Sequence, residues 1–373
     1  MTAIVQSAIT IFLFFFILGT LVVIHELGHF ITARLAGVRV LEFGIGFPPR
    51  AKILRSSGET LYTLNWLPIG GFVKLEGEDG DAGDDPRSFV NAPLPTRLFI
   101  LAAGVLMNLV AAFAIFMFIA WLASPLIGVK VPSVEAGSPA ERAGLHAGDA
   151  ITTINGRSYE YFGQYVGQPD LLRDLRDFAG QSVVLGIRHP DGSAAQVEVT
   201  LRPRDELTPQ RGPLGIPTTT DEPFYETYFS GQYTGHDLPT AIGIASGETS
   251  RWFGLILGGL RDLASTFVHN PTAPPPVSGP VGIATQMGDV FWGAGPIMTL
   301  YVAAILSANL ALVNALPFPP LDGGRMLVIL LKRIFGSRIS LQAERVTYFV
   351  GFAFLMAFLI WVTIFDVVRG TST

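Results

Sequence analysis

Leu21-Val-Val-Ile-His25-Glu26-Leu-Gly-His29-Phe-Ile31 places two histidines and a glutamate in an apolar segment, and no charged residue precedes His25. On a helix, positions four apart share a face, so both imidazoles could bind one metal ion while Glu26 lies near a bound water. Ionisable residues are costly in a membrane-spanning segment and mark functional sites there. The pattern predicts a zinc hydrolase site inside a membrane. The alternative, a surface helix with two water-facing histidines, is disfavoured by the apolar flanks.

The composition is that of an integral membrane protein. Hydrophobic residues make up 49% of the chain and charged residues 15%, with a mean hydropathy of +0.45, whereas about 25% of a soluble domain is charged. The net charge of −5 without a basic run disfavours nucleic acid as a partner. The absence of cysteine excludes thiolate ligands and a cysteine nucleophile, which leaves histidine and carboxylate as metal ligands.

Four apolar stretches are long enough to span a bilayer, at residues 5–35, 98–126, 294–320 and 346–365, and only the first is interrupted, by the metal motif and Arg34. The first lacks the basic start of a cleavable signal peptide, so we expect it to be retained. The short loop between the third and fourth spans is rich in arginine and lysine, which predicts a cytoplasmic location. We therefore expect a multi-pass protein of the inner (plasma) membrane, with both termini and the long segment at 127–290 outside the cytoplasm.

Asp322 is the candidate third metal ligand. It follows an uncharged stretch and three prolines that interrupt the helix before it. Spans one and three run in the same direction, so Asp322 should approach the membrane on the same side as the two histidines. The alternative is that Asp322 caps a helix beginning near Gly323.

The motifs together resemble the site-2 protease family of intramembrane zinc metalloproteases. The resemblance covers nearly the whole chain and rests on five stretches: His25 to His29, Gly70-Gly71-Phe-Val-Lys-Leu75, Gly104 to Asn108, Ser278-Gly-Pro-Val-Gly-Ile283, and Asn314-Ala-Leu-Pro317-Phe-Pro-Pro-Leu-Asp322-Gly-Gly324. One departure is Val105, where many members have proline. It bears on local helix shape and not on metal chemistry.

This resemblance implies roles for six residues: His25, His29 and Asp322 as zinc ligands, Glu26 as the catalytic carboxylate, and Asn314 and Pro317 in positioning the substrate backbone. The residue types suit this chemistry. Zinc lowers the pKa of its bound water to near 7, and a carboxylate can take a proton from that water and return it to the departing amine.

A membrane-associated β-hairpin is expected after the first span. Residues 59–65 alternate as a strand does, and Gly70-Gly71 could begin a second strand that ends at Leu75. A substrate helix must unwind before its peptide bond can be cut, and such a hairpin could bind the extended segment by strand addition. On this hypothesis Thr63, Gly70 and Gly71 contact the substrate. The alternative is a plain cytoplasmic hairpin.

Residues 127–205 have the composition of a soluble α/β domain. The run from Gly137-Ser-Pro-Ala140 through Ile154-Asn-Gly156 resembles a PDZ domain of the circularly permuted bacterial type, which binds extended peptides along a strand edge. The domain organisation expected is a first membrane-core part at 1–126, the PDZ domain, a connector with an amphipathic helical segment at 206–290, and a second membrane-core part at 291–373.

The sequence thus predicts an α-helical polytopic membrane protein with four transmembrane helices, an inserted α/β PDZ domain and a membrane-associated β-hairpin. By resemblance it would cut transmembrane segments of single-span substrates, such as anti-sigma factors or remnant signal peptides, after an upstream site-1 protease has trimmed them. The PDZ domain would filter the trimmed substrates, and membrane lipid would surround the core. The alternative is a noncatalytic membrane PDZ adaptor with a structural zinc site, against which Glu26 argues. A transporter is disfavoured because no inverted repeat is evident.

Overall fold

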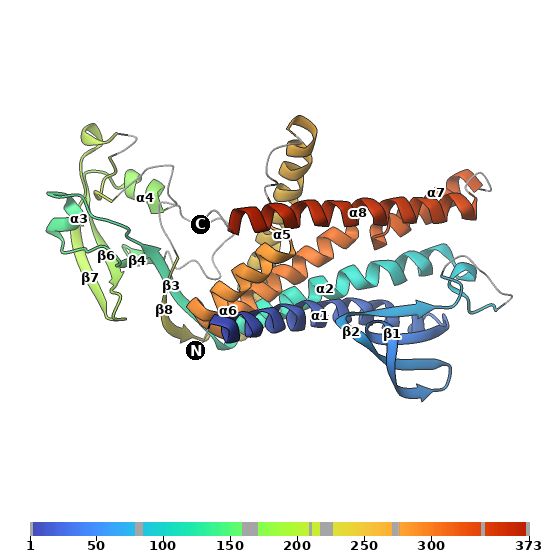
Figure 1. Ribbon diagram of the computed structural model, residues 1–373. Helices are drawn as coiled ribbons and strands as arrows, with labels where there is room; N and C mark the ends of the chain where they lie inside the picture. The colour runs from blue at the N-terminus through green and yellow to red at the C-terminus, as the bar shows by residue number, and fades with distance from the viewer. Residues whose placement is uncertain are drawn as a thin grey trace. The chain divides into compact units, whose positions relative to one another are not determined.

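The computed structural model describes residues 3–78, 85–158, 171–208, 211–216, 227–270, 275, 277–336 and 340–370. The chain divides into two compact units. One combines Met1–Ile115 with Trp252–Thr373, and the other is Phe116–Arg251. Figure 1 shows the helices and strands of both units.

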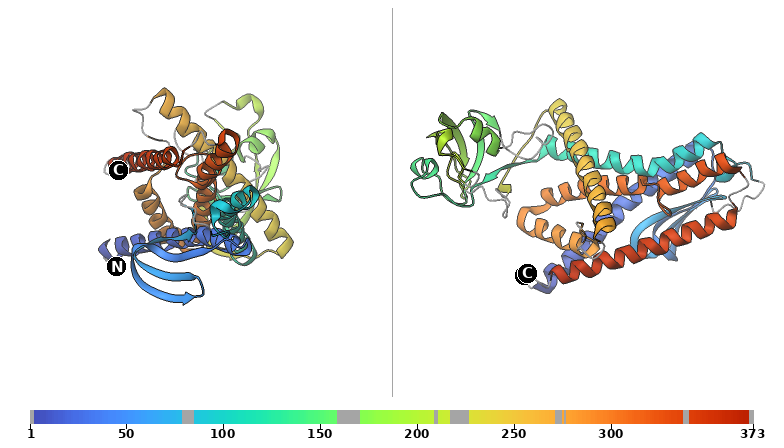
Figure 2. Two further views of the ribbon diagram at one scale, coloured as in Figure 1. Left: turned by 90° about the vertical axis from the view of Figure 1, so that its right-hand side faces the viewer. Right: turned by 90° about the horizontal axis from the view of Figure 1, so that it is seen from above.

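Four helices within the described residues are long and apolar enough to cross a membrane. They are α1 (Ala3–Leu35), α2 (Leu94–Leu122), α6 (Pro280–Ala315) and α8 (Leu341–Gly370). Each overlaps one predicted span, and they run along one another in both Figure 1 and Figure 2. The prediction of a multi-pass membrane protein with four spans is confirmed.

Helix α6 begins earlier than the predicted third span. It starts at Pro280, and its regular geometry is interrupted at Gly295, which has φ 82° and precedes Pro296. Only glycine adopts this left-handed conformation without strain, and the following proline cannot donate a helical hydrogen bond. The predicted start at residue 294 therefore coincides with an internal break, and a further helical segment precedes it.

The start of α6 is fixed by a buried carboxylate from the end of α8. Asp366 Oδ1 accepts a hydrogen bond from Gly279 N at 3.1 Å, and Oδ2 accepts one from Gly282 N at 2.9 Å. A Cβ atom on Gly279 would lie 2.8 Å from Asp366 Oδ2. The glycines of the Ser-Gly-Pro stretch are thus needed for the close approach of this carboxylate to the first turn of the helix.

The hairpin consists of β1 (Val40–Ser57) and β2 (Thr60–Leu75), which pair antiparallel. The two predicted strands, 59–65 and 70–75, fall in β2 except for residue 59, whereas its partner β1 was not predicted. Because both strands fold back, residues 40–45 pair with 61–64 on one side and with 71–75 on the other. The hairpin is therefore wider than two strands.

Thr63 lies in the interior of this sheet. It pairs with Gly44 on one side and Ile53 on the other, and its side chain is 1% exposed. Its hydroxyl donates to Glu42 Oε1 at 2.7 Å. The expectation that Thr63 belongs to a free strand edge is wrong, because the folding back of β1 covers both of its sides. The outer segment 71–75 forms the edge of the sheet that faces α1, where Val73 N donates to Glu26.

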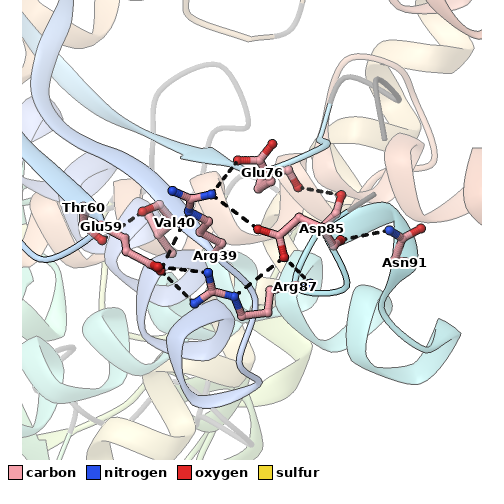
Figure 3. Close-up of polar contacts among 9 residues, drawn as sticks. Arg39, Val40, Glu59, Thr60, Glu76, Asp85, Arg87 and Asn91 are labelled. Atoms are coloured by element: carbon pink, nitrogen blue, oxygen red, sulfur yellow. Dashed lines mark hydrogen bonds and ion pairs between the residues drawn. The ribbon is translucent and has the colours of Figure 1, made fainter. Parts of the chain in front are cut away.

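Ion pairs join the hairpin to the segment that follows it (Figure 3). The guanidinium of Arg39 lies 3.4 Å from Asp85 Oδ2, and Arg87 donates to both carboxylate oxygens of Glu59 at 2.8 and 2.9 Å. The hydrogen bond from the Arg87 side chain lowers the pKa of Glu59, and the Arg87 backbone N–H lowers the pKa of Asp85. Because these groups are exposed, their contribution to stability is small.

The second unit contains an antiparallel sheet in the order β7-β6-β4-β3-β8, with β5 paired to β4. The strands are β3 (Ser124–Lys130), β4 (Ala150–Ile154), β5 (Arg157–Ser158), β6 (Ser182–Arg188), β7 (Ala194–Thr200) and β8 (Thr227–Thr234), with short helices α3 (Pro139–Arg142) and α4 (Leu171–Asp177). Its buried core extends past residue 205 to Leu214 and Ile216. Helix α5 (Leu238–His269) occupies the place of the predicted amphipathic segment.

Candidate metal centre

Three side chains from two distant parts of the chain converge in the membrane unit. His25 Nε2 and His29 Nε2, one turn apart on α1, lie 2.9 and 3.3 Å from Asp322 Oδ2 and 3.1 Å from each other. Asp322 is the first residue of α7 (Asp322–Phe335). Its Oδ2 atom is buried and makes no hydrogen bond of acceptable geometry within the described residues. The three atoms therefore face one another as ligands of a shared cation do.

The donor set fits zinc. Two imidazoles and one carboxylate with a further position open is the composition of catalytic zinc sites. Tetrahedral ligands at about 2.1 Å from zinc lie about 3.4 Å apart, and the three separations here, 2.9 to 3.3 Å, are close to that value. Small adjustments of the side chains would accommodate the ion.

Both imidazoles are oriented by α2 through their other ring nitrogen. His29 Nδ1 lies 2.8 Å from Ile100 O, so it donates its proton there and leaves the Nε2 lone pair for a metal. His25 Nδ1 lies 3.3 Å from the amide of Asn108, whose Oδ1 atom is buried without another partner in the described part of the chain. A half-turn of this amide would present Oδ1 as the acceptor that a metal-binding His25 requires.

Two glycines allow α1 and α2 to approach closely at the centre. A Cβ on Gly104 would lie 2.4 Å from His29 Nε2 and 2.7 Å from His25 Cε1. A Cβ on Gly28 would lie 2.4 Å from Ala103 O. The Gly-x-x-x-Asn stretch of α2 therefore has a physical explanation, since its glycine gives room to the rings and its asparagine lies beside one of them.

The turn before α7 fixes Asp322. The N-cap position of this helix is Leu321, and no side chain caps it. The alternative that Asp322 is the helix cap is therefore wrong. A Cβ on Gly323 or Gly324 would come within 2.4 Å of backbone atoms of the preceding turn. The two glycines thus let α7 start directly against the end of α6, which brings the carboxylate to the histidines.

Glu26 lies beside the ligands and contacts the hairpin. Its Oε2 atom accepts a hydrogen bond from Val73 N at 3.1 Å. A cavity of about 280 Å³ opens here, and it is lined by the metal-ligand side chains, Glu26 and part of the segment 71–75. The backbone of this outer segment therefore borders the centre, next to the carboxylate that could move a proton.

Of the other residues predicted to bind substrate, some line this cavity and others do not. Asn314 and Gly71 line the cavity, and Asn314 Nδ2 donates to Leu310 O at 3.0 Å. Gly70 has φ 74° and packs against α1, where a Cβ would lie 2.9 Å from a methyl group of Val22. Pro317 and Thr63 do not line the cavity as it is formed by the described residues.

Sequence reasoning assigned no role to the groups that orient the site. Ile100 O and Val73 N are backbone atoms, which leave no signal in the side-chain pattern. Asn108 lies in the Gly-x-x-x-Asn stretch, but only the packing of α2 against α1 shows that its side chain contacts His25.

Comparison with known proteins agrees with this arrangement. The pattern of peptidase family M50 matches residues 13–358. A protein of Clostridium acetobutylicum, provisionally named a zinc metalloprotease, is 34% identical over 354 residues, which cover 94% of this chain and 95% of that one. The zinc metalloprotease RasP of Shouchella clausii is 26% identical over an alignment of 439 positions, which covers 96% of this chain and 98% of that one. The chain therefore belongs to peptidase family M50 and is a membrane zinc metalloprotease.

Proposed function

We propose that this zinc metalloprotease cuts peptide bonds within the transmembrane segments of single-span proteins, with His25, His29 and Asp322 as zinc ligands and Glu26 as the catalytic carboxylate. One observation carries the proposal. The three ligand atoms meet beside Glu26 at buried positions, between a helix that can cross a membrane and the start of α7. A site built there reaches peptide bonds that a soluble protease cannot reach.

The residues of the chain supply the proton transfers. Zinc, when bound, acts as a Lewis acid and acidifies its water. Glu26 would take a proton from the water that attacks the scissile carbonyl and later deliver it to the departing amine. Its hydrogen bond to Val73 N holds it at the edge of the cavity beforehand. The amide of Asn314, which also lines the cavity, can donate to the oxyanion that develops on the scissile carbonyl.

The outer segment 71–75 is the proposed docking edge for the unwound substrate. It borders the cavity, and Val73 N points away from β1 toward Glu26. An extended peptide could add along this edge by backbone hydrogen bonds. Gly71 is the cavity-lining residue of the predicted pair. Gly70, Pro317 and Thr63 would act indirectly, by shaping the turn, the end of α6 and the sheet interior.

The second unit is proposed to be an extracytoplasmic PDZ domain that filters substrates. Its antiparallel sheet, short helices and strand edges support this assignment. We propose that the PDZ domain covers residues 127–205 and that Leu214 and Ile216, which follow it in the chain, complete its core. The other proposed parts are the membrane-core parts at 1–126 and 291–373 and the connector at 206–290. The substrates proposed are single-span stubs already trimmed by a site-1 protease, among them anti-sigma factors and remnant signal peptides. The basic loop before α8 would then face the cytoplasm.

The test uses Glu26→Gln in the purified full-length protein with a model transmembrane substrate. We expect zinc content equal to that of the wild type and cleavage reduced by roughly 10²- to 10⁴-fold. Glu59→Gln, which changes an exposed hairpin carboxylate, is the control and should cleave normally. If the wild type binds zinc but cuts no transmembrane segment, the noncatalytic adaptor replaces the protease. If it binds no zinc while folded, the ligand assignment fails.

A further inference from the structure

Two adjoining cavities lie beside the metal centre, between the first turn of α2, the helix α7 and the start of α8. One has a volume of about 350 Å³ and the other about 650 Å³. Four residues line both of them, namely Val90, Arg97, Ile329 and Lys332. Since α2 and α8 both begin here, the cavities lie where spanning helices enter the membrane, at one membrane surface.

The walls of these cavities are positively charged. Five cationic side chains line them against two carboxylates, in a set made of Arg97, Arg325, Lys332, Arg333, Arg345, Glu78 and Glu344. Both carboxylates already have partners. Glu78 pairs with Arg325 and accepts from Leu75 N, and Glu344 accepts from Lys332 Nζ at 2.6 Å and from the Tyr348 hydroxyl. The walls therefore carry a net positive charge, which attracts an outside anion.

Arg97 stands out among these side chains. Its guanidinium lies 5.4 Å from the centre of the Phe89 ring. Its Nε atom is buried and has no hydrogen-bond partner within the described residues. A buried charged donor without a partner is costly, so a bound acceptor at this position would be favourable.

The surroundings favour an acceptor that carries hydrocarbon. Leu101, Ile329 and Leu341 add apolar surface to the first cavity. Helix α7 exposes large apolar side chains, which are Leu327, Leu330, Ile334 and Phe335. An amphipathic helix of this kind lies at a bilayer surface, where its apolar face meets acyl chains.

We infer that these cavities bind the phosphate headgroup of an anionic phospholipid, with Arg97 as a direct contact. Basic pockets between membrane helices attract anionic headgroups by charge and by hydrogen bonds to phosphate oxygens. The lipid would occupy the space between α2, α7 and α8, and its acyl chains would follow the apolar face of α7. The site shares Glu78, Leu101 and Arg325 with the wall of the metal cavity. A bound lipid would therefore stabilise the position of α7, which begins with Asp322.

The experiment measures lipid binding and does not depend on proteolysis. Full-length protein is extracted from vesicles of phosphatidylcholine mixed with phosphatidylglycerol, and the retained lipid is counted by mass spectrometry. In parallel, the unfolding midpoint is recorded in detergent with phosphatidylglycerol, phosphatidylcholine or inorganic phosphate. We expect selective retention of phosphatidylglycerol and a higher midpoint with that lipid alone.

Two variants probe the site in different ways. Arg97→Gln removes the proposed phosphate contact, and Val90→Trp narrows both cavities without changing charge. Each should weaken phosphatidylglycerol binding by roughly tenfold or more. Arg55→Gln, which removes an equal charge from the hairpin and lines neither cavity, should bind as the wild type does.

Several results would overturn the inference, and the first needs only the wild type. Equal retention of both lipids would mean that the charges serve only membrane orientation. An equal rise of the midpoint with inorganic phosphate would indicate a small-anion site. Displacement of the lipid by a peptide with a free carboxyl end, but not by its amide, would assign the cavities to the cleaved chain. Unchanged lipid binding by folded Val90→Trp would show that the lipid binds outside these cavities.

Discussion

Gly104→Ala is the sharpest test of how α2 supports the metal centre. The new methyl carbon would lie 2.4 Å from His29 Nε2, 2.6 Å from His29 Cε1 and 2.7 Å from His25 Cε1. Packed interiors do not absorb such overlap, so the rings or the helix must move by about 1 Å. A zinc site tolerates displacements of only about 0.2 Å in its ligand distances. Both histidines are therefore displaced together.

We expect zinc binding roughly 10- to 100-fold weaker than in the wild type, and a loss of about 1–3 kcal/mol in the free energy of unfolding from overpacking. The assay is competition with a graded series of chelators, read as zinc per protein molecule, with thermal unfolding in detergent beside it. Gly258→Ala is the matched control, because a Cβ at that position of α5 meets nothing within 4 Å, and alanine favours the helix by up to about 1 kcal/mol. If folded Gly104→Ala holds zinc as tightly as the wild type, the described packing of α2 on the rings is incorrect.

Three further outcomes follow from the contacts. Asn108→Leu should weaken zinc binding by roughly 10-fold, because His25 loses the partner of its second nitrogen; unchanged chelator competition would contradict this. Asp366→Ala should cost about 1–3 kcal/mol, measured by thermal unfolding, since two N–H groups at the start of α6 lose their acceptor. The carboxylates paired with Arg87 have lowered pKa values, so the stabilisation they give is complete above their unfolded pKa near 4 and disappears as the pH falls through the lower folded values. Hydrogen-exchange protection of residues 85–91, corrected for the intrinsic exchange rate, should fall there. Arg87→Gln should remove the part of this dependence that comes from Glu59 and keep the part that comes from Asp85, because the backbone N–H of residue 87 remains.

Local sequence predicted the parts of the fold and site that local geometry determines. The separation of His25 and His29 fixes their shared face on any helix, and uncharged length reveals the spans. Strand β1 escaped prediction because Pro48-Pro49 in its middle disfavours a strand. Leu214 and Ile216 escaped because they lie in a stretch rich in turn-forming residues, and only the folded core shows that they are buried. Thr63 was assigned to a free edge because alternation does not indicate how many neighbours a strand has.

The ligands of the proposed zinc site are far apart along the chain, two near its beginning and one near its end. During synthesis the first span enters the bilayer long before Asp322 has been translated. A partly made chain therefore holds only two of the three ligands and cannot assemble the complete centre. The complete ligand set therefore exists only once nearly the whole polypeptide has been made and α7 has docked.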